Sequence, residues 1–455
     1  NCYYKEMTEM KKTSHTFHFP LSLGEGSGVR LYFQQALYHL RENPVISWIS
    51  VLGTALSICM IMVIVITLRV RIADCEPEVN RSRSLYVPNM SYRAKGDTSG
   101  SSANSSMSVQ TGRECFKTLT TAEAVTLASN PGKVRVSLPA GAKMTADMVQ
   151  TDEAFWQVFR FRFLDGKPFT AADLSSGLPR AVIAASVARR LFGRTDVSGQ
   201  HIELNHVDFQ VCGVVADVSM LATDAYAQVW IPYTAGDAEA NSWGYNLMGP
   251  MRAVILARSR ADFPAVREEC ERLRQKYNDA QEGVEVFYRG QPDTQFTHLY
   301  RSWSQEPDVQ GVVLRYVAVM LILLIVPAIN LSSMTLSRMR KRMAEIGVRK
   351  AFGATANELM RQVFLENLLL TCLAGLLGLL LSYAATFVLN GFLFGNSTNA
   401  YLSGETSLTA GELLNPWIFL AAFGFCLLMN LLSAGIPAWR ASRMNIVEAI
   451  NGKAH

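Results

Sequence analysis

Two of the seven histidines and the eight cysteines are the residues whose types and spacing could supply metal or redox chemistry. His201 and His206 lie on either side of a short predicted strand, but no third ligand accompanies them. We therefore interpret them as two histidines at the surface or in a turn, which is simpler than a metal site. The cysteines show no CxxC or other metal-type spacing. We accordingly expect no metal site and no cofactor in this chain.

Motifs for phosphate binding and hydrolysis are missing from the sequence. GxxxxGK[ST], HExxH and GxSxG are all absent, and Gly24, Gly26 and Gly28 form only a weak GxGxG with no strand before it. The sequence therefore predicts no ATP-binding cradle of the usual kind. We expect that the chain has no catalytic residues and is not itself an enzyme.

A basic segment, Arg338–Arg361, is the most informative polar pattern. Seven of its 24 residues are Lys or Arg, and only Glu345 and Glu358 are acidic. Long apolar runs flank it on both sides, so it must lie at a membrane surface, and the positive-inside tendency makes that surface the cytoplasmic one. The 390–416 loop contains no Lys or Arg, which favours the opposite side for that loop.

One stretch of the basic segment has features suited to binding a protein. Two glycines flank a helical turn that carries an apolar edge beside two cations. On charge alone, a solvated face that only fixes orientation would be the better interpretation, but the glycine break and the apolar edge favour docking in a protein cleft. The predicted docking residues are Glu345, Gly347, Val348, Arg349, Lys350, Ala351, Phe352, Gly353 and Ala354.

Four apolar runs are long enough to cross about 30 Å of hydrocarbon as helices. The first, residues 45–68, carries no charge. Within the second we expect Pro327 to bend the helix, and in the third Gly375 and Gly378 should let a neighbouring helix approach closely. The predicted segments are an N-terminal extension without structure (1–28), an amphipathic interfacial helix (29–43), spans at 45–68, 312–336, 364–389 and 417–436, a cytoplasmic segment (337–363), an outer loop (390–416) and a cytoplasmic tail (437–455).

Residues 69–311 have the composition of a water-soluble α+β domain. Ser186 is predicted to cap a helix that Gly193 ends, and Ser259 with Asp262 should cap a longer helix that has Cys270 on its apolar face. The polar run 96–112 reads as a flexible surface loop. The predicted strands are Lys133–Leu138, Arg180–Ala185, His201–Leu204, Val207–Val215, Tyr226–Ile231, Arg252–Ala257 and Val284–Tyr288.

Three parts of the sequence resemble one protein family. Pro327–Asn330, Glu345–Ala354 and Phe364–Asn367 resemble the cytoplasmic signature of the MacB/FtsX-like family of ABC transporter permeases. Thr151–Phe169 and Ser186–Asp217 are similar to the extracytoplasmic domain of these permeases, and Pro437–Ile450 resembles the family's ending.

The resemblance implies an α-helical membrane protein with four transmembrane helices plus an α+β extracytoplasmic domain built from two lobes, one inserted in the other. It implies a multi-pass protein of the bacterial inner membrane, with both termini in the cytoplasm and the large domain in the periplasm. The implied partners are a cytoplasmic ABC ATPase subunit that docks on residues 345–354, a second copy or related permease, membrane lipid, and a periplasmic adaptor or outer-membrane protein. Nucleic acid is not expected as a partner.

The implied function is to couple ATP hydrolysis on a separate subunit to motion of the periplasmic domain, for export or extraction of a substrate that the sequence does not identify. An FtsX-like regulator of a periplasmic cell-wall hydrolase and a membrane-anchored sensor are the alternatives. In an oxidising compartment Cys75, Cys115, Cys212 and Cys270 allow three sets of pairings. If one disulfide forms, Cys75–Cys115 is the preferred pairing, because Cys270 is expected to lie in the core.

Overall fold

The computed structural model describes residues 44–97, 100–139, 141–302, 305–341 and 355–394, with single positions at 348, 352–353, 402 and between 417 and 428. The predicted extension (1–28), interfacial helix (29–43) and tail (437–455) lie outside these residues. The chain divides into two compact units. One contains residues up to Met60, Leu321–Leu381 and those from Leu420 onward, and the other contains Ile61–Met320 and Ser382–Phe419.

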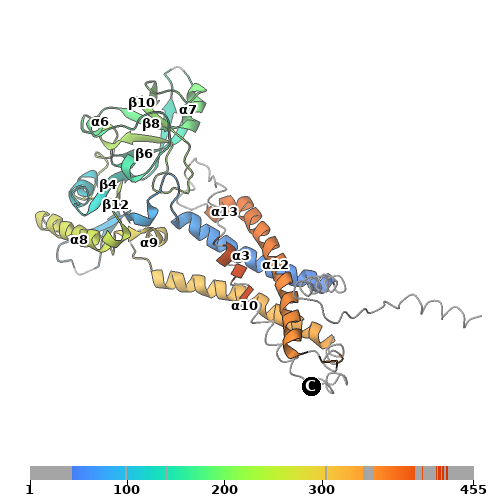
Figure 1. The fold of residues 1–455 in the computed structure, drawn as a ribbon. Coiled ribbons are helices and arrows are strands. Elements are labelled where there is room, and N and C mark those ends of the chain that lie inside the picture. Colours follow the sequence, from blue (N-terminus) through green and yellow to red (C-terminus); the bar gives the residue numbers. More distant parts are fainter. Residues whose placement is uncertain are drawn as a thin grey trace, which may run out of the picture. The chain divides into compact units, whose positions relative to one another are not determined.

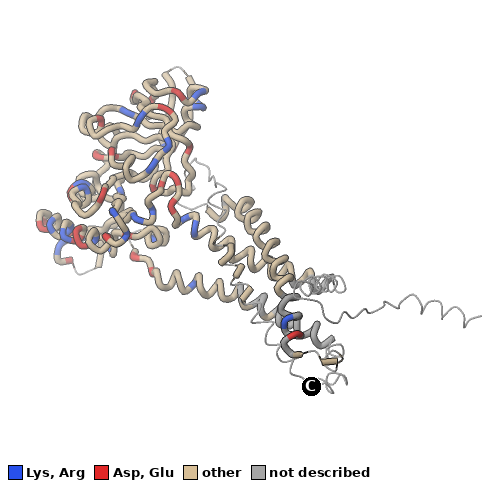
Figure 2. Tube along the Cα trace, viewed as in Figure 1, with Lys and Arg blue, Asp and Glu red and all other residues tan. Residues whose placement is uncertain are grey.

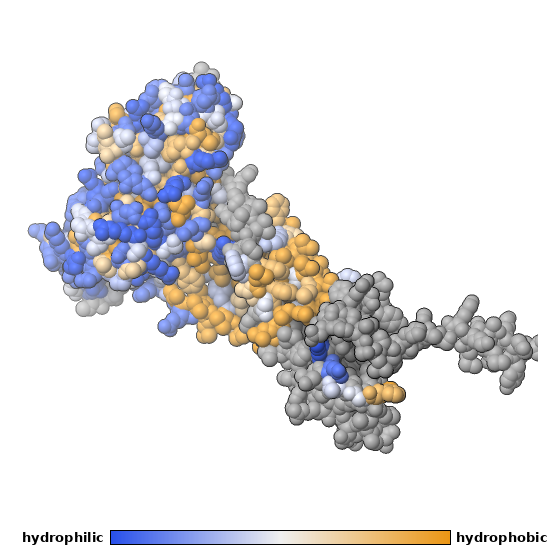
Figure 3. Space-filling view, in the orientation of Figure 1, coloured by the Kyte–Doolittle hydropathy of each residue, from blue (hydrophilic) through white to orange (hydrophobic). Residues whose placement is uncertain are grey.

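Three long helices, α3 (Pro44–Ile72), α10 (Val309–Lys341) and α12 (Ala356–Val388), are built largely from apolar residues. Within them Val51–Ile72 and Leu368–Val388 are long and apolar enough to cross a membrane, with mean hydropathies of 2.6 and 2.1. α10 has a shorter apolar stretch, Val309–Leu323, and continues through Pro327 as one helix. Hydrophobic residues cover these helices, and charged residues are sparse along them (Figures 2 and 3).

Two of the four predicted spans thus correspond to apolar helices among the described residues. The first is longer than expected, since α3 continues past Leu68 to Ile72. The span predicted at 312–336 lies within α10, and most of the one at 417–436 lies outside the described residues.

Close packing between α3 and α12 depends on Gly378. Val51 and Ala55 of α3 form a buried cluster with Leu370 and Ala374 of α12. A Cβ atom added to Gly378 would lie 2.7 Å from the Ala55 carbonyl oxygen. This confirms that Gly378 lets a neighbouring helix approach closely.

The second unit contains an α+β domain whose strands and helices alternate along the chain (Figure 1). Its strands are β1 (Ser84–Val87), β2 (Met90–Ala94), β3 (Ala103–Ser105), β4 (Ala122–Ser129), β5 (Gly132–Ser137), β6 (Lys143–Thr151), β7 (Phe163–Gly166), β8 (Arg180–Ala184), β9 (His201–Leu204), β10 (Val207–Val215), β11 (Val229–Pro232), β12 (Met251–Ala257), β13 (Val284–Phe287) and β14 (Asp293–Thr294). Its helices are α4 (Val109–Cys115), α5 (Phe155–Val158), α6 (Ala171–Ser175), α7 (Ala185–Phe192), α8 (Phe263–Ala280) and α9 (Gln295–Tyr300), and α13 (Asn390–Phe394) follows α12.

Most strands join one sheet of order β11-β8-β10-β9-β5-β6-β4-β12-β1-β14. β11 also pairs in parallel with β6, so the strands from β11 to β6 close into a ring. β4, β12, β1 and β14 continue outward from that ring, and β13-β2-β3 form a separate small sheet. The closed ring removes the unpaired edges that an open sheet would expose.

Strand β12 separates two hydrophobic cores. All of its residues are buried, and because side chains alternate along a strand, Val254 and Leu256 enter one core while Ala253 and Ile255 enter the other. The first core surrounds Trp230 and draws mostly on residues 128–231. The second draws on segments before and after that range, from Leu85 to Leu127 and from Tyr233 to Tyr288.

Most of the predicted local structure is confirmed, with one wrong cap. The strands predicted at His201–Leu204 and Val207–Val215 match β9 and β10 to the residue, and Ser259 and Asp262 form the predicted capping box. Gly193 ends α7 in the left-handed region at φ 73. Ser186 does not cap α7, however, because the helix begins at Ala185 and the Asp217 carboxylate accepts from the Ser186 backbone N–H at 2.7 Å.

The prediction of a flexible loop at 96–112 is wrong, because this run contains β3 and the start of α4. Ser108 caps α4 by accepting from the Thr111 backbone N–H, and Met107 is fully buried. The Thr111 hydroxyl lies 3.0 Å from the Tyr277 hydroxyl of α8. The small polar residues thus serve as caps and buried hydrogen-bonding partners, which composition does not distinguish from loop residues.

We predict that Gly378→Val lowers the stability of the full chain in detergent by about 1–3 kcal/mol, because the new side chain overpacks the contact with α3. Leu376→Val is the control, since Leu376 lies on the same helix and is exposed. Thermal unfolding measures both variants. Equal unfolding temperatures for the two would contradict the packing role of Gly378.

Candidate functional site

The described part of the predicted docking segment is a helical turn that ends in glycine. The Phe352 backbone N–H donates to the Val348 carbonyl at 3.1 Å, and Gly353 follows in the left-handed region at φ 94. α12 then begins with a reciprocal cap, in which the Thr355 N–H donates to the Glu358 carboxylate at 2.9 Å and the Glu358 N–H donates to the Thr355 hydroxyl at 3.3 Å.

Two apolar side chains of this turn are exposed. Phe352 is 82% exposed and Val348 is 47% exposed. They lie one helical turn apart, so they share a face. The structure thus brings together two of the predicted docking residues beside Gly353, and Glu345, Gly347, Arg349, Lys350, Ala351 and Ala354 lie outside the described residues.

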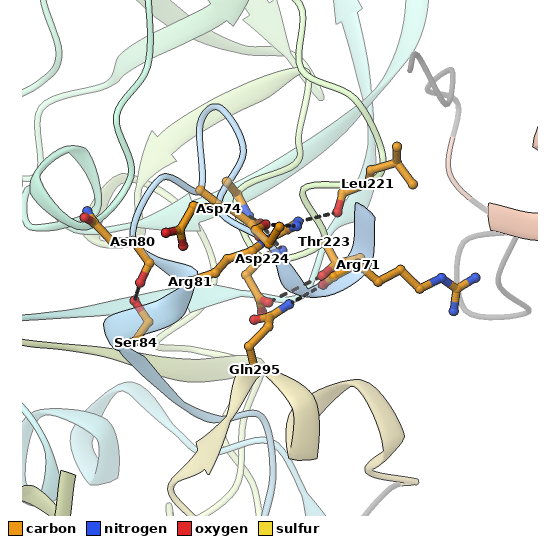
Figure 4. A network of polar contacts seen from close by, with 12 residues as sticks. Arg71, Asp74, Asn80, Arg81, Ser84, Leu221, Thr223, Asp224 and Gln295 are labelled. Carbon is orange, nitrogen blue, oxygen red and sulfur yellow. Dashed lines mark hydrogen bonds and ion pairs between the residues drawn. The ribbon is translucent and has the colours of Figure 1, made fainter. Parts of the chain in front are cut away.

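A second candidate site lies where α3 ends and the α+β domain begins (Figure 4). Arg81 is 2% exposed, and its guanidinium donates to the Val70 and Ala73 carbonyls, each at 3.0 Å. The Val70 carbonyl is in the last turn of α3 and the Ala73 carbonyl directly follows the helix, so neither accepts from a further helical N–H. The same guanidinium donates to the Leu221 carbonyl at 2.6 Å. Arg81 therefore caps α3 and binds it to a loop of the domain.

The Glu78 carboxylate completes this connection. One oxygen accepts from the Arg81 Nε at 2.6 Å, and the other accepts from the backbone N–H groups of Asp224 and Ala225 at 2.8 and 2.9 Å. Burial alone would lower the pKa of Arg81, but the neighbouring Glu78 carboxylate raises it, so the guanidinium stays charged. Each described polar atom of the pair has a partner, as a buried ion pair requires.

A histidine–aspartate pair lies next to Arg81. His298 of α9 contacts the buried Asp224 carboxylate at 3.2 Å and stacks on Tyr86 with ring centroids 4.6 Å apart. Arg252 of β12 approaches Asp224 at 3.5 Å. Burial alone would raise the pKa of Asp224, but His298 and then Arg252 hold it well below its usual range. Burial alone would lower the pKa of His298, but Asp224 raises it.

We refer to Arg81, Glu78, Asp224, His298 and Arg252 as the α3 joint. These residues come from the chain after α3, the loop after β10, helix α9 and strand β12. Gln295 at the start of α9 adds a direct bond to α3, since its amide donates to the Arg71 carbonyl at 2.9 Å. The joint offers no nucleophile or metal-ligand set for catalysis, and what it can do is hold the end of α3 and the domain together.

Family models match both parts of the chain. The model described as MacB-like periplasmic core domain matches residues 47–273, and the model described as FtsX-like permease C-terminal matches residues 317–446. The chain belongs to the MacB/FtsX-like permease family. Arg81, Glu78, Asp224 and Arg252 of the α3 joint lie within the residues that match the MacB-like periplasmic core domain, and His298 follows them.

Relatives of this permease include two curated export proteins. Pyoverdine export ATP-binding/permease protein PvdT from Pseudomonas aeruginosa is 26% identical over 299 residues, which are 65% of this chain and 41% of that protein. Macrolide export ATP-binding/permease protein MacB from Bdellovibrio bacteriovorus is 26% identical over 271 residues, which are 59% of this chain and 38% of that protein. The chain thus spans about four-tenths of the length of these relatives.

One solved structure gives a weaker likeness. The periplasmic region of MacB from Actinobacillus actinomycetemcomitans is 14% identical, covers 45% of this chain and 90% of that one, and gives a TM-score of 0.32. That likeness is too low to add to the family match.

The other residues singled out from the sequence are separate from both sites. His201 pairs with Asp208 at 2.8 Å on the surface, and His206 lies in the exposed turn between β9 and β10 at φ 72. The described residues contain no group of three metal-type ligands. The suggested Cys75–Cys115 disulfide is wrong, because the six described cysteines form none, and Cys115 and Cys270 are both buried in the second core.

Sequence reasoning missed the α3 joint. The spacing of Glu78 and Arg81 is that of an i, i+3 ion pair and could have suggested their contact. Asp224, Arg252 and His298 are distant in sequence from Arg81 and from one another, and nothing local to each of them indicates that they meet.

We predict that Arg81→Met destabilises the protein by about 3–5 kcal/mol, because it leaves the Glu78 carboxylate buried without its partner. Arg83→Met is the control, since the Arg83–Glu123 pair is 30% and 46% exposed and should contribute under about 1 kcal/mol. The double variant Arg81→Met/Glu78→Met should recover part of the loss. Chemical unfolding of the full chain measures all three, and equal losses for Arg81→Met and Arg83→Met would refute the assignment.

We predict a pH dependence from His298, which is faced by Asp224, Asp293 and Arg252. Because the pKa of His298 is raised on folding, the stabilisation of the folded state by the His298–Asp224 pair is complete below the unfolded-state pKa of about 6.5. This stabilisation is lost as the pH rises through the folded-state pKa of His298. The lowered pKa of Asp224 keeps that carboxylate ionised throughout this range. His298→Gln should therefore cost more stability at about pH 5.5 than at about pH 9, by about 1–3 kcal/mol.

Thermal unfolding across this pH range tests the His298 prediction, with the exposed His201→Gln as its control. A loss that does not change with pH, or that grows toward alkaline pH, would show that His298 is not charged against Asp224.

Proposed function

We propose that this chain is the membrane subunit of an ABC exporter in which an ATPase moves the periplasmic domain through the permease helices. Four crossings would put both termini and residues 337–363 in the cytoplasm, and residues 69–311 and 390–416 outside. ATP hydrolysis would take place on a separate nucleotide-binding subunit. Two copies of the permease, or this chain and a related one, would work together.

The observation that carries this proposal is the exposed apolar turn at Val348 and Phe352. The Phe352 side chain is 82% exposed beside a basic stretch, so it is accessible to a protein partner. Aromatic residues are enriched at the energetic centre of protein interfaces, and cations suit the rim. We therefore assign this turn as the docking site of the ATPase, with residues 345–354 as the coupling segment.

The capped start of α12 would pass the ATPase's motion onward. Gly353 lies two residues before Thr355, whose reciprocal cap with Glu358 begins α12. α12 packs closely on α3 at Gly378, and α3 ends in the joint around Arg81. Displacement of the turn would reach the periplasmic domain along these continuous helices and through the joint at the end of α3.

Export is the activity that the names of the relatives support. PvdT is named for pyoverdine export and MacB for macrolide export. At 26% identity over part of their length we carry over export and leave the cargo unassigned. A regulator of a cell-wall hydrolase has no specific observation in its favour. Loss of substrate efflux from vesicles on deletion of this chain would separate the exporter from that regulator.

We predict that Phe352→Asp uncouples the chain from its ATPase. Loss of an aromatic residue at the centre of an interface costs about 2 kcal/mol or more, equivalent to about thirtyfold in affinity. Co-purification and ATPase stimulation measure the loss. Val207→Asp is the control, because Val207 is an apolar residue of the α+β domain that is 55% exposed.

Gly353→Pro should have the same effect as Phe352→Asp, since proline requires φ near −65° and Gly353 adopts φ 94. Both variants should remain folded and inserted, because both positions are exposed. Full ATPase stimulation in both would contradict the coupling role.

A further inference from the structure

A pocket of about 320 Å³ lies beside the α3 joint. It is formed by the end of α3, the loop after β10, helix α9 and the end of α13, all within the second unit. Its volume is within the range of small-ligand pockets. Neither the family description nor the names of the relatives assigns a ligand to it.

The wall of this pocket is cationic. Arg71, Arg252, Arg301 and His298 line it, and among the described residues no acidic side chain belongs to the lining. Asp224 lies behind Arg252 and His298, and Asp293 pairs with Arg301, so two carboxylates offset part of the charge. The Arg71 guanidinium donates to the Leu393 carbonyl at 2.8 Å, a neutral partner. The pocket therefore keeps an excess of positive charge.

Two buried nitrogen atoms of the wall have no hydrogen-bond partner among the described residues. They are the Nε of Arg252, a residue that is 8% exposed, and the Nδ1 of His298. The Nε of arginine can only donate, and Nδ1 also donates when the imidazole is protonated. Buried donors are normally satisfied, so both atoms indicate an acceptor that comes from outside the protein.

The rest of the wall combines polar residues, among them Asn130, Thr223 and Gln295, with an apolar part that lies at the ends of both apolar helices. Met220, Leu221, Leu299 and Phe394 contribute to it. Arg71 is in the last turn of the apolar stretch Val51–Ile72, and Phe394 follows Leu368–Val388 after a short interval. In a membrane-embedded chain these positions fall at the boundary between hydrocarbon and water. An anion with an attached apolar chain matches both the charge and the place.

We propose that this pocket binds the phosphate group of an anionic membrane amphiphile, with its apolar part against Leu299 and Phe394. Arginine suits this ligand, since its fork of N–H donors matches phosphate oxygens and it is weakly hydrated. Gln295 of the pocket wall donates to the carbonyl of Arg71 in α3. Arg252 and His298 of the wall belong to the joint. A ligand in the pocket would therefore fill the space beside the joint. A soluble organic phosphate shares this chemistry and is separated from a lipid by the test.

The test measures binding to the purified full chain in a neutral detergent by thermal-shift titration and native mass spectrometry. The probes are phosphatidylglycerol, a diacylglycerol that lacks phosphate, and soluble glycerol phosphate. We expect phosphatidylglycerol to bind and stabilise the protein, and diacylglycerol not to. A stabilising effect of glycerol phosphate that equals that of phosphatidylglycerol would overturn a lipid as the ligand.

Two variants locate the binding in this pocket. Arg71→Gln removes one cation of the wall, and Thr223→Asp places a carboxylate at an exposed position of the lining. Each should weaken the apparent affinity for phosphatidylglycerol about tenfold, which corresponds to one charge-assisted contact. Arg69→Gln is the matched control, because Arg69 is in the same last turn of α3 but does not line the pocket.

Equal affinity in wild type, Arg71→Gln, Thr223→Asp and Arg69→Gln would overturn the proposal, since it would show only nonspecific attraction of lipid to a basic protein. A weakened affinity in Arg69→Gln as large as in Arg71→Gln would overturn it as well. Because the readout is lipid binding without nucleotide or ATPase, the result does not depend on the proposed export function.

Discussion

One guanidinium holds the end of a membrane helix to a folded domain in this protein. Arg81 occupies the carbonyls that α3 leaves without partners, and it reaches the domain through Leu221 and through Glu78. A buried arginine is costly to remove from water, and its position is stable only because several acceptors and one carboxylate surround it. Because Arg81 needs all of these partners at once, the connection between α3 and the domain can form in only one geometry. Apolar packing alone would allow α3 to rotate or slide.

The joint also reaches the strand that the two cores share. Arg252 lies on β12, and Tyr86, which stacks on His298, lies on the neighbouring β1. β12 has hydrophobic residues buried on both faces, so its position is fixed by two cores rather than one. A displacement of α3 would therefore act on the most constrained part of the domain. This arrangement suits a protein in which a whole domain must follow the motion of a helix.

Those parts of the structure that depend on local sequence patterns could be predicted from the sequence. Apolar length predicted α3 and α12, alternation predicted β9 and β10, and the Ser259–Asp262 spacing predicted a cap. The family resemblance was also readable, since it rests on contiguous motifs. Prediction from sequence patterns was wrong where polar residues are buried. Ser108 and Thr111 look like loop residues by composition, but their hydroxyls satisfy α4 and Tyr277.

The joint and the pocket could not be predicted from the sequence, for the same reason. Glu78, Asp224 and His298 come from segments that only the tertiary fold brings together, and each of them taken alone resembles a surface residue. At the coupling segment the sequence pointed to Val348 and Phe352, and the structure adds that both side chains are exposed. The role of that segment in binding an ATPase rests on the proposal.

Hydrogen–deuterium exchange at Asp224 and Ala225 tests the central claim most directly. The backbone N–H groups of these two residues donate to the Glu78 carboxylate, so their exchange reports whether the joint is closed. In the full chain we expect both amides to exchange slowly, and to exchange much faster in Arg81→Met while amides in the centre of β12 stay protected. Rapid exchange at Asp224 and Ala225 in the wild type, or rates unaffected by Arg81→Met, would contradict the account.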